Sequence, residues 1–163
     1  MGKQMLDNYC STTVVFKYMK HSSLSISFFL QLAKTQNIVG YRFDRALGGL
    51  SLTEFLVLYQ LEQAPNRQLS RIELAEQVGV TASGITKILL PMMKVHLIKD
   101  GKTSDDARVR SVEATAAGRE KMQNEMDRLQ FLVDELLPEG SKREAEAFIN
   151  NLKAIAIRAG GSR

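Results

Sequence analysis

A single glycine between two short apolar runs, Gly79, most constrains what this chain can fold into. It supplies the positive φ that a tight turn between two helices requires, and Ala75 is small enough to let the second helix cross the first closely. The pattern predicts two short helices over residues 71–78 and 82–95. The apolar residues then fall where a helix-turn-helix needs buried contacts, at Leu74, Val78, Val80, Ile85 and Ile88.

The second helix of this pair is predicted to have a polar outer face. That face comprises Ala82, Ser83, Thr86 and Lys87, with Thr81 as the residue that caps the helix. It has no acidic residue to repel phosphates, which suits a helix that enters the major groove of DNA. Two short amphipathic helices around a glycine also occur in domains that bind no DNA, so this segment alone leaves both interpretations open.

The residues that follow favour the DNA-binding interpretation. Residues 97–99 and 109–114 are strand-like and flank a polar, turn-rich stretch, so they predict a β-hairpin. A helix-turn-helix followed by a basic hairpin is a winged helix. We therefore expect a mainly α fold with a small β-hairpin wing, and we expect the basic residues of the hairpin to contact DNA: Lys99, Lys102, Arg108 and Arg110.

Longer helices are predicted on both sides of this lobe. Apolar positions recur at helical spacing over residues 25–47, 52–63, from Thr115 onward, and again after Pro138. Three capping boxes precede apolar runs: Ser51 with Glu54, Ser70 with Glu73, and Ser141 with Glu144. The expected organisation is an N-terminal extension over 1–24, a dimerisation helix over 25–49, a DNA-binding lobe over 50–114, and C-terminal dimerisation helices over 115–163.

From about Ser25 to Leu152 the chain resembles the MarR family of bacterial transcription regulators. The most specific marks are the Asp-x-Arg of Asp106 and Arg108 at the wing, and the Thr-x-x-Gly-Arg of residues 115–119. Further resemblance lies in the segments Leu52–Phe55, Glu73–Val80 and Ser83–Lys87.

This resemblance implies roles for individual residues. The helix from Thr81 would lie in the major groove, Arg108 would lie in or near the minor groove, and Asp106 would brace the wing, unless it only shapes a turn. Family members are homodimers joined through the first and last two helices, which implies a near-palindromic operator. The residues expected at that interface are Phe29, Leu32, Leu129, Val133, Leu136, Phe148, Ile149, Leu152 and Ile155.

The chain departs from the family pattern at three positions. His96 stands where family members usually have a glycine, and we interpret it as a helix terminator because histidine tolerates the left-handed conformation. Pro91 lies inside the predicted recognition helix, where it removes one backbone hydrogen bond and predicts a kink. Arg110 occupies a strand position that is often apolar in the family.

Composition excludes several other functions. The 163-residue sequence shows no phosphate loop, nucleophile elbow or cluster of metal ligands, so no enzyme, metal or cofactor is expected. The single cysteine, Cys10, excludes an internal disulfide framework, and the absence of a signal-peptide core or membrane-length apolar stretch predicts a cytoplasmic protein. The net charge of +4 permits contact with nucleic acid without requiring it.

The sequence therefore predicts a homodimeric, sequence-specific DNA-binding transcription regulator, most simply a repressor relieved by a small aromatic effector. Two alternatives stay open. One is a winged helix that serves as a protein-interaction module without specific DNA binding. The other is a redox-sensing regulator that uses Cys10, although this residue lies further upstream of Leu52 than the peroxide-sensing branch of the family suggests.

Overall fold

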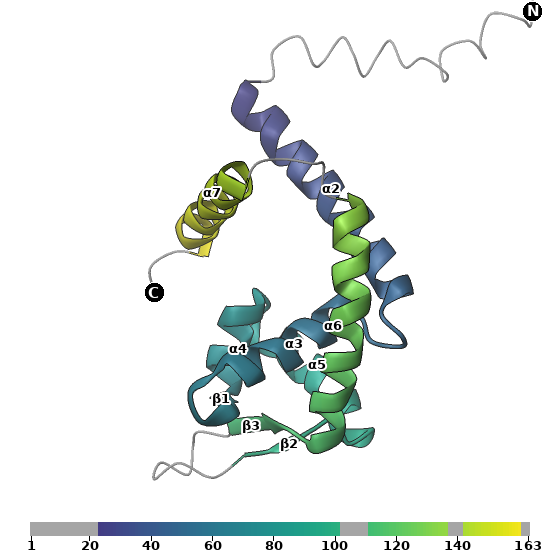
Figure 1. The fold of residues 1–163 in the computed structure, drawn as a ribbon. Coiled ribbons are helices and arrows are strands. Elements are labelled where there is room, and N and C mark those ends of the chain that lie inside the picture. The colour runs from purple at the N-terminus through teal and green to yellow at the C-terminus, as the bar shows by residue number, and fades with distance from the viewer. Residues whose placement is uncertain (1–22, 102–110, 137–141, 161–163) are drawn as a thin grey trace, which may run out of the picture. The chain divides into compact units, whose positions relative to one another are not determined.

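The computed structural model describes residues 23–101, 111–136 and 142–160. Helices dominate, and a small sheet lies among them (Figure 1). The elements in chain order are α2 (Leu24–Ala46), α3 (Leu52–Gln63), the short 3-10 helix η2 (Pro65–Arg67), β1 (Gln68–Ser70), α4 (Arg71–Val78), α5 (Ala82–Lys94), β2 (Ile98–Asp100), β3 (Ser111–Ala114), α6 (Ala116–Leu136) and α7 (Lys142–Gly160). This order confirms the predicted fold class, a mainly helical chain with a small sheet.

The chain divides into two units, the first ending at Arg42 and the second beginning at Phe43. The described part of the first unit is the larger share of α2. Most of its large apolar side chains are exposed, although Leu32 and Val39 are half-buried. The rings of Phe28 and Phe29 meet edge to face with 5.6 Å between their centroids. No described helix is long and apolar enough to cross a membrane.

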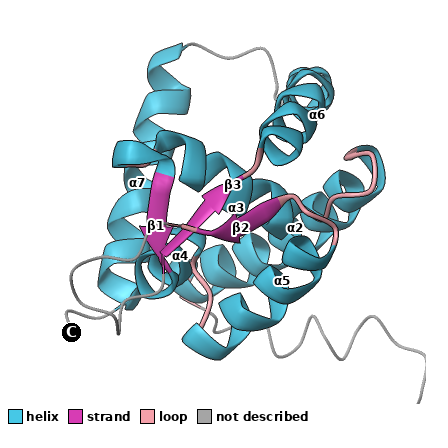
Figure 2. Ribbon diagram, turned by 90° about the horizontal axis from the view of Figure 1, so that it is seen from below, coloured by secondary structure: helices cyan, strands magenta, loops and turns pink. Residues whose placement is uncertain are grey.

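The second unit contains the hydrophobic core. Helix α3 is buried on several sides, as its nearly continuous apolar sequence predicts. Helices α3, α4 and α5 pack against the three strands, which lie side by side in Figure 2. The fully buried side chains of this core are Leu47, Val57, Leu58, Leu61, Leu74, Ile85, Leu89, Met92, Ile98 and Val112.

The sheet has three antiparallel strands in the order β1-β3-β2. The sequence predicts only the β2–β3 hairpin, so the third strand corrects that expectation. Strand β1 has three residues, with Leu69 the one buried side chain among them, and this is too short for an alternating pattern to be visible. Pairing with β3, through Leu69 opposite Val112, is what makes it a strand.

Two predicted capping boxes are confirmed. At α3, the Ser51 hydroxyl accepts from the Glu54 N–H and the Glu54 carboxylate accepts from the Ser51 N–H. Ser70 and Glu73 repeat this arrangement at α4, and the hydrogen bonds from Ser70 lower the pKa of Glu73 below its ordinary value. The third predicted box begins at Ser141, which lies outside the described residues.

The predicted chain reversals are also confirmed. Gly79 ends α4 with φ of 77°, and His96 follows α5 with φ of 59°, so His96 does terminate this helix in the left-handed region. Helix α5 continues through Pro91 to Lys94. Pro65-Asn66 is another break that the sequence predicts, and there Asn66 and Arg67 both have positive φ, at 58° and 56°.

The last two helices differ in burial. On α6, the side of the helix toward the lobe buries Gly118, Met122, Glu125 and Leu132. On α7 none of the described side chains is buried.

Candidate nucleic-acid interface

Helices α4 and α5 form the helix-turn-helix that the sequence predicts. The turn between them is closed by backbone hydrogen bonds, with Gly79 and Val80 both donating to the Ala75 carbonyl at 3.0 and 2.9 Å. Leu74, Ala75 and Ile85 are buried between the helices and the rest of the lobe. The other predicted contacts, at Val78, Val80 and Ile88, are half-buried.

The predicted outer face of α5 is exposed. Ala82, Ser83 and Lys87 are exposed and Thr86 is half-buried, whereas Ile85, Leu89 and Met92 pack inward. Every residue of α5 is described, and none is acidic. The structure therefore brings the predicted groove-facing residues together on one surface.

The two threonines on this helix already make hydrogen bonds. The Thr81 hydroxyl caps α5 by accepting from the Gly84 N–H at 3.0 Å. The Thr86 hydroxyl donates to the Ala82 carbonyl one turn earlier, also at 3.0 Å. While this bond is made, Thr86 offers an outside partner its acceptor lone pairs.

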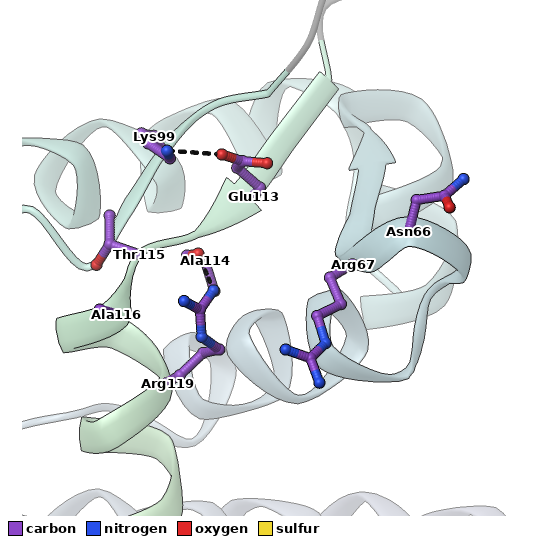
Figure 3. A pocket seen from close by; sticks show the side chains of 8 residues that line it. All are labelled: Asn66, Arg67, Lys99, Glu113, Ala114, Thr115, Ala116 and Arg119. Carbon is purple, nitrogen blue, oxygen red and sulfur yellow. Dashed lines mark hydrogen bonds and ion pairs between the residues drawn. The ribbon is translucent and has the colours of Figure 1, made fainter.

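Among the basic residues predicted for the wing, the structure describes Lys99. Its ammonium group pairs with Glu113 of the neighbouring strand at 2.8 Å, so its charge is partly compensated (Figure 3). The next residue, Asp100, pairs with Arg71 at 3.4 Å and ties the wing to the start of α4. The other predicted wing residues, Lys102, Asp106, Arg108 and Arg110, lie outside the described residues.

A cavity of about 310 Å³ lies at the root of the wing (Figure 3). Its lining residues are Asn66, Arg67, Lys99, Glu113, Ala114, Thr115, Ala116 and Arg119. Both of its arginines have partners. Arg67 and Arg119 lie 3.6 and 3.9 Å from the Glu62 carboxylate, and Arg119 also donates to the Ala114 carbonyl at 2.8 Å.

The Thr-x-x-Gly-Arg motif has a structural role in this part of the molecule. The Thr115 hydroxyl donates to the His96 carbonyl at 2.7 Å and accepts from the Gly118 N–H at 3.0 Å. Gly118 lies directly against the Leu97 carbonyl, where a side chain has no room. Together these contacts fasten the first turn of α6 to the segment that leads into the wing.

Sequence reasoning missed one charged residue, Glu125. This side chain is 2% exposed and lies among Gly48, Lys121 and Arg128. The only signal in the sequence is the spacing of the two basic residues, four before and three after the glutamate on one helix. That spacing is common on solvated helix faces, so it did not distinguish a buried cluster from an exposed one.

A second cavity, of about 480 Å³, lies beside the same helix. It is lined by Ala46, Asp127, Arg128, Phe131, Leu132 and Glu135, and the Phe131 side chain is 69% exposed. Within the described residues, no group of histidine, cysteine, aspartate or glutamate side chains could hold a metal ion.

The residues predicted for dimerisation are not buried within the chain. Phe29, Phe148 and Ile149 are exposed, and the remaining six are half-buried: Leu32, Leu129, Val133, Leu136, Leu152 and Ile155.

Comparison with known proteins gives matches to solved structures. No protein-family model matches the sequence, and no curated protein matches it either. The transcriptional regulator BldR from Sulfolobus solfataricus superposes with a TM-score of 0.72 at 25% identity, over 80% of this chain and 93% of BldR.

Two further matches are structures of complexes with DNA. The transcriptional regulator MosR from M. tuberculosis has a TM-score of 0.66 at 26% identity, over 78% of this chain and 93% of MosR. Sco3205, a MarR family transcriptional regulator from Streptomyces coelicolor, has a TM-score of 0.69 at 16% identity, over 83% and 88% of the two chains. The chain thus has a MarR-like winged-helix fold, and these structural neighbours are regulators and not enzymes.

Proposed function

We propose that this chain is a homodimeric, sequence-specific DNA-binding transcription regulator of the bacterial cytoplasm, and that it represses until a small molecule releases it. The observation that carries the proposal is the outer face of α5, which is exposed and free of acidic residues. This face follows a capped helix and a closed glycine turn, as in a helix-turn-helix. MosR, which is similar over most of its length, is known in complex with DNA.

In this proposal the two DNA-contacting elements have different tasks. The first turns of α5 enter the major groove, with Thr81, Ala82, Ser83, Thr86 and Lys87 nearest the bases and phosphates. The wing reaches the backbone and the minor groove through Lys99, Lys102, Arg108 and Arg110, braced by Asp106. Before Lys99 can bind a phosphate, it must exchange its ion pair with Glu113, so we expect it to contribute less than Arg108.

Binding to duplex DNA at two salt concentrations tests the proposal. A duplex selected by the protein from a random library, and a scrambled duplex of the same composition, are titrated at 50 and 200 mM salt. We expect tight binding to the selected duplex, weaker binding to the scrambled one, and a steep loss of both as salt rises, because phosphate contacts release counterions. Failure to select any duplex would favour the protein-interaction module instead.

The dimer in this proposal uses the helices on either side of the lobe. Residues 25–49 and 115–163 supply the interface, residues 50–114 form the DNA-binding lobe, and residues 1–24 have no assigned role. The support is the exposed apolar surface of α2 and α7, including Phe29, Phe148 and Ile149. A two-fold dimer requires a near-palindromic operator with half-sites about one helical turn (~10 bp) apart.

The proposed effector is a small aromatic acid. The cavity beside α6 offers the exposed ring of Phe131 and the side chain of Leu132 to an aromatic ring. The guanidinium of Arg128, which also lies 3.5 Å from Glu125, would pair with a carboxylate, in a lining that also contains Asp127 and Glu135. Titration with benzoate and 4-hydroxybenzoate tests this part, and we expect release of the selected duplex. An Arg128→Gln variant that responds as the wild type does would count against this cavity.

Redox sensing by Cys10 is the second candidate function. Our proposal expects Cys10→Ser to leave DNA affinity and any response to peroxide unchanged. Peroxide-dependent release of DNA that disappears in this variant would establish the thiol as the sensor.

A further inference from the structure

Glu125 is the one charged side chain that is buried among the described residues. Taking a carboxylate out of water carries a penalty that its ion pairs often fail to recover, and apolar replacements of buried ionic groups are often neutral or stabilising. Stability alone therefore does not explain a glutamate at this position. Its partners indicate what else it does.

The Glu125 carboxylate and its partners form hydrogen bonds to the backbone of the turn between α2 and α3. Its Oε2 accepts from the Gly48 N–H at 2.9 Å, and its Oε1 accepts from the Lys121 ammonium group at 2.8 Å. Lys121 also donates to the Gly48 carbonyl, and Arg128 lies 3.5 Å from the carboxylate. Both peptide groups of Gly48 are thus held from α6.

A side chain at Gly48 would displace the ends of two side chains in this cluster. A Cβ built on it would lie 2.6 Å from Glu125 Oε1 and would also meet the Arg128 guanidinium. A larger residue at this position would therefore disturb the contacts of Glu125 and Arg128 with the turn.

The rest of the turn explains why these hydrogen bonds to Gly48 matter. Leu47 and Leu50 are buried and anchor its two sides, but its tip consists of Gly48 and Gly49, and Gly49 has φ of 90°. Two adjacent glycines give a chain its greatest backbone freedom. The backbone hydrogen bond from Leu50 N–H to the Leu47 carbonyl, at 3.1 Å, closes the turn, and the contacts from α6 add the hydrogen bonds to Gly48 itself.

We infer that Glu125 is a positioning residue, which fixes the α2–α3 turn and thereby sets the spacing of DNA half-sites that the dimer accepts. The inference rests on the proposed function. The turn joins α2, which supplies part of the proposed interface, to the lobe that carries α5. A single conformation of the turn gives the two lobes of a dimer one separation, whereas a loose turn lets each lobe adapt to other separations.

The test uses the duplex that the wild-type protein selects, together with versions that have one base pair inserted or deleted between the half-sites. We expect the wild type to bind both altered duplexes at least tenfold more weakly. Glu125→Met should fold and dimerise but bind all three duplexes within threefold of one another. Glu125→Gln should retain the discrimination, because its amide oxygen can still accept from the Gly48 N–H.

A matched control is available on the same helix. Glu120 is exposed on α6, so Glu120→Met removes a carboxylate without touching the turn and should leave the discrimination unchanged. A loss of stability alone would weaken binding to all duplexes by the same factor. Wild-type discrimination in a folded Glu125→Met variant would overturn the inference.

Two further measurements keep the inference testable if Glu125→Met does not fold. Lys121→Met removes the donor to the Gly48 carbonyl and should reduce the discrimination at least threefold, and no reduction would overturn the inference. In the wild type, the Gly48 amide hydrogen should exchange with solvent at least tenfold more slowly than that of Gly49. Equal rates would show that Glu125 does not hold the Gly48 N–H.

The same experiments separate this inference from the proposed function. A wild-type protein that selects no duplex contradicts the proposed function and, with it, the role of the turn in spacing. A wild type that selects a duplex but tolerates changes in spacing contradicts only the inference.

Discussion

Gly118 at the start of α6 lies in contact with the carbonyl of Leu97, at a point where no side chain fits. The contact joins the helix that leaves the wing to the segment that enters it. It gives the glycine of the Thr-x-x-Gly-Arg motif a packing role, where the resemblance alone suggested only family membership.

The Gly118→Ala substitution should therefore destabilise the lobe. The added methyl group meets backbone, which cannot rotate away, so we expect a loss of about 1–3 kcal/mol in the free energy of unfolding. Urea unfolding followed by circular dichroism measures it. Gly40→Ala is the matched control, because a Cβ there has no neighbour within 4 Å and helix propensity alone should add about 0.5–1 kcal/mol. Equal effects of the two substitutions would show that the contact with Leu97 is not tight.

Protonation of Glu125 should account for part of the loss in the free energy of unfolding at low pH. Burial raises the pKa of this carboxyl group, but the hydrogen bonds from Lys121 and Gly48 and the charges of Lys121 and Arg128 outweigh it, so its pKa lies below the ordinary value of 4.5. A depressed folded-state pKa gives stability that is present above the unfolded pKa and is lost as pH falls through the folded value. Glu125→Gln should thus lose less stability than the wild type between pH 6 and pH 3, as measured by thermal unfolding. Identical pH profiles would indicate that Glu125 does not titrate differently in the two states.

Substitutions on α5 and on the wing, the two elements proposed to contact DNA, should have different effects on binding. Ser83→Ala and Thr86→Ala should each weaken binding to the selected duplex by about 1–3 kcal/mol and leave the scrambled duplex nearly unaffected, since hydroxyl groups contact base edges without charge. Arg108→Ala should weaken both duplexes and reduce the slope of log affinity against log salt by about one, since it loses a phosphate contact. Competition titrations measure both effects. The reverse pattern would show that wing and recognition helix are wrongly assigned.

Removing α7 should disrupt the dimer. A chain that ends at Pro138 lacks Phe148, Ile149, Leu152 and Ile155, so less apolar surface remains to hold two copies together. We expect monomer or aggregate in analytical ultracentrifugation, and loss of binding to a duplex with two half-sites. A well-folded dimer of the shortened chain would place the interface elsewhere.

Local signals allowed much of the lobe to be predicted from the sequence. Capping by Ser51 and Ser70, the turn at Gly79 and the left-handed His96 each depend on interactions within a few residues, and the structure confirms all of them. Strand β1 was missed because its pairing partner, β3, lies more than 40 residues further along the chain. Three residues with one apolar position are not a recognisable strand until that partner is present.

The site was predictable to a smaller extent. The exposed residues at the start of α5 follow from helical periodicity, which also predicts that Ile85 packs inward. Leu89 is buried without having been predicted, and the predicted Ile88 is only half-buried. The burial of Glu125 does not follow from any local pattern, because it depends on a glycine 77 residues away in the sequence. Likewise, the pairing of Lys99 with Glu113 is visible only once the strand register is known.

The hydrogen bond from Thr86 to the Ala82 carbonyl limits which bases this threonine can recognise. While its proton is engaged by the backbone, the hydroxyl accepts, so its complement in the major groove is an amino group: N6 of adenine or N4 of cytosine. To donate to the N7 or O6 of guanine, the hydroxyl would first have to give up its bond to Ala82. An operator contacted at Thr86 should accordingly present an adenine or a cytosine edge there.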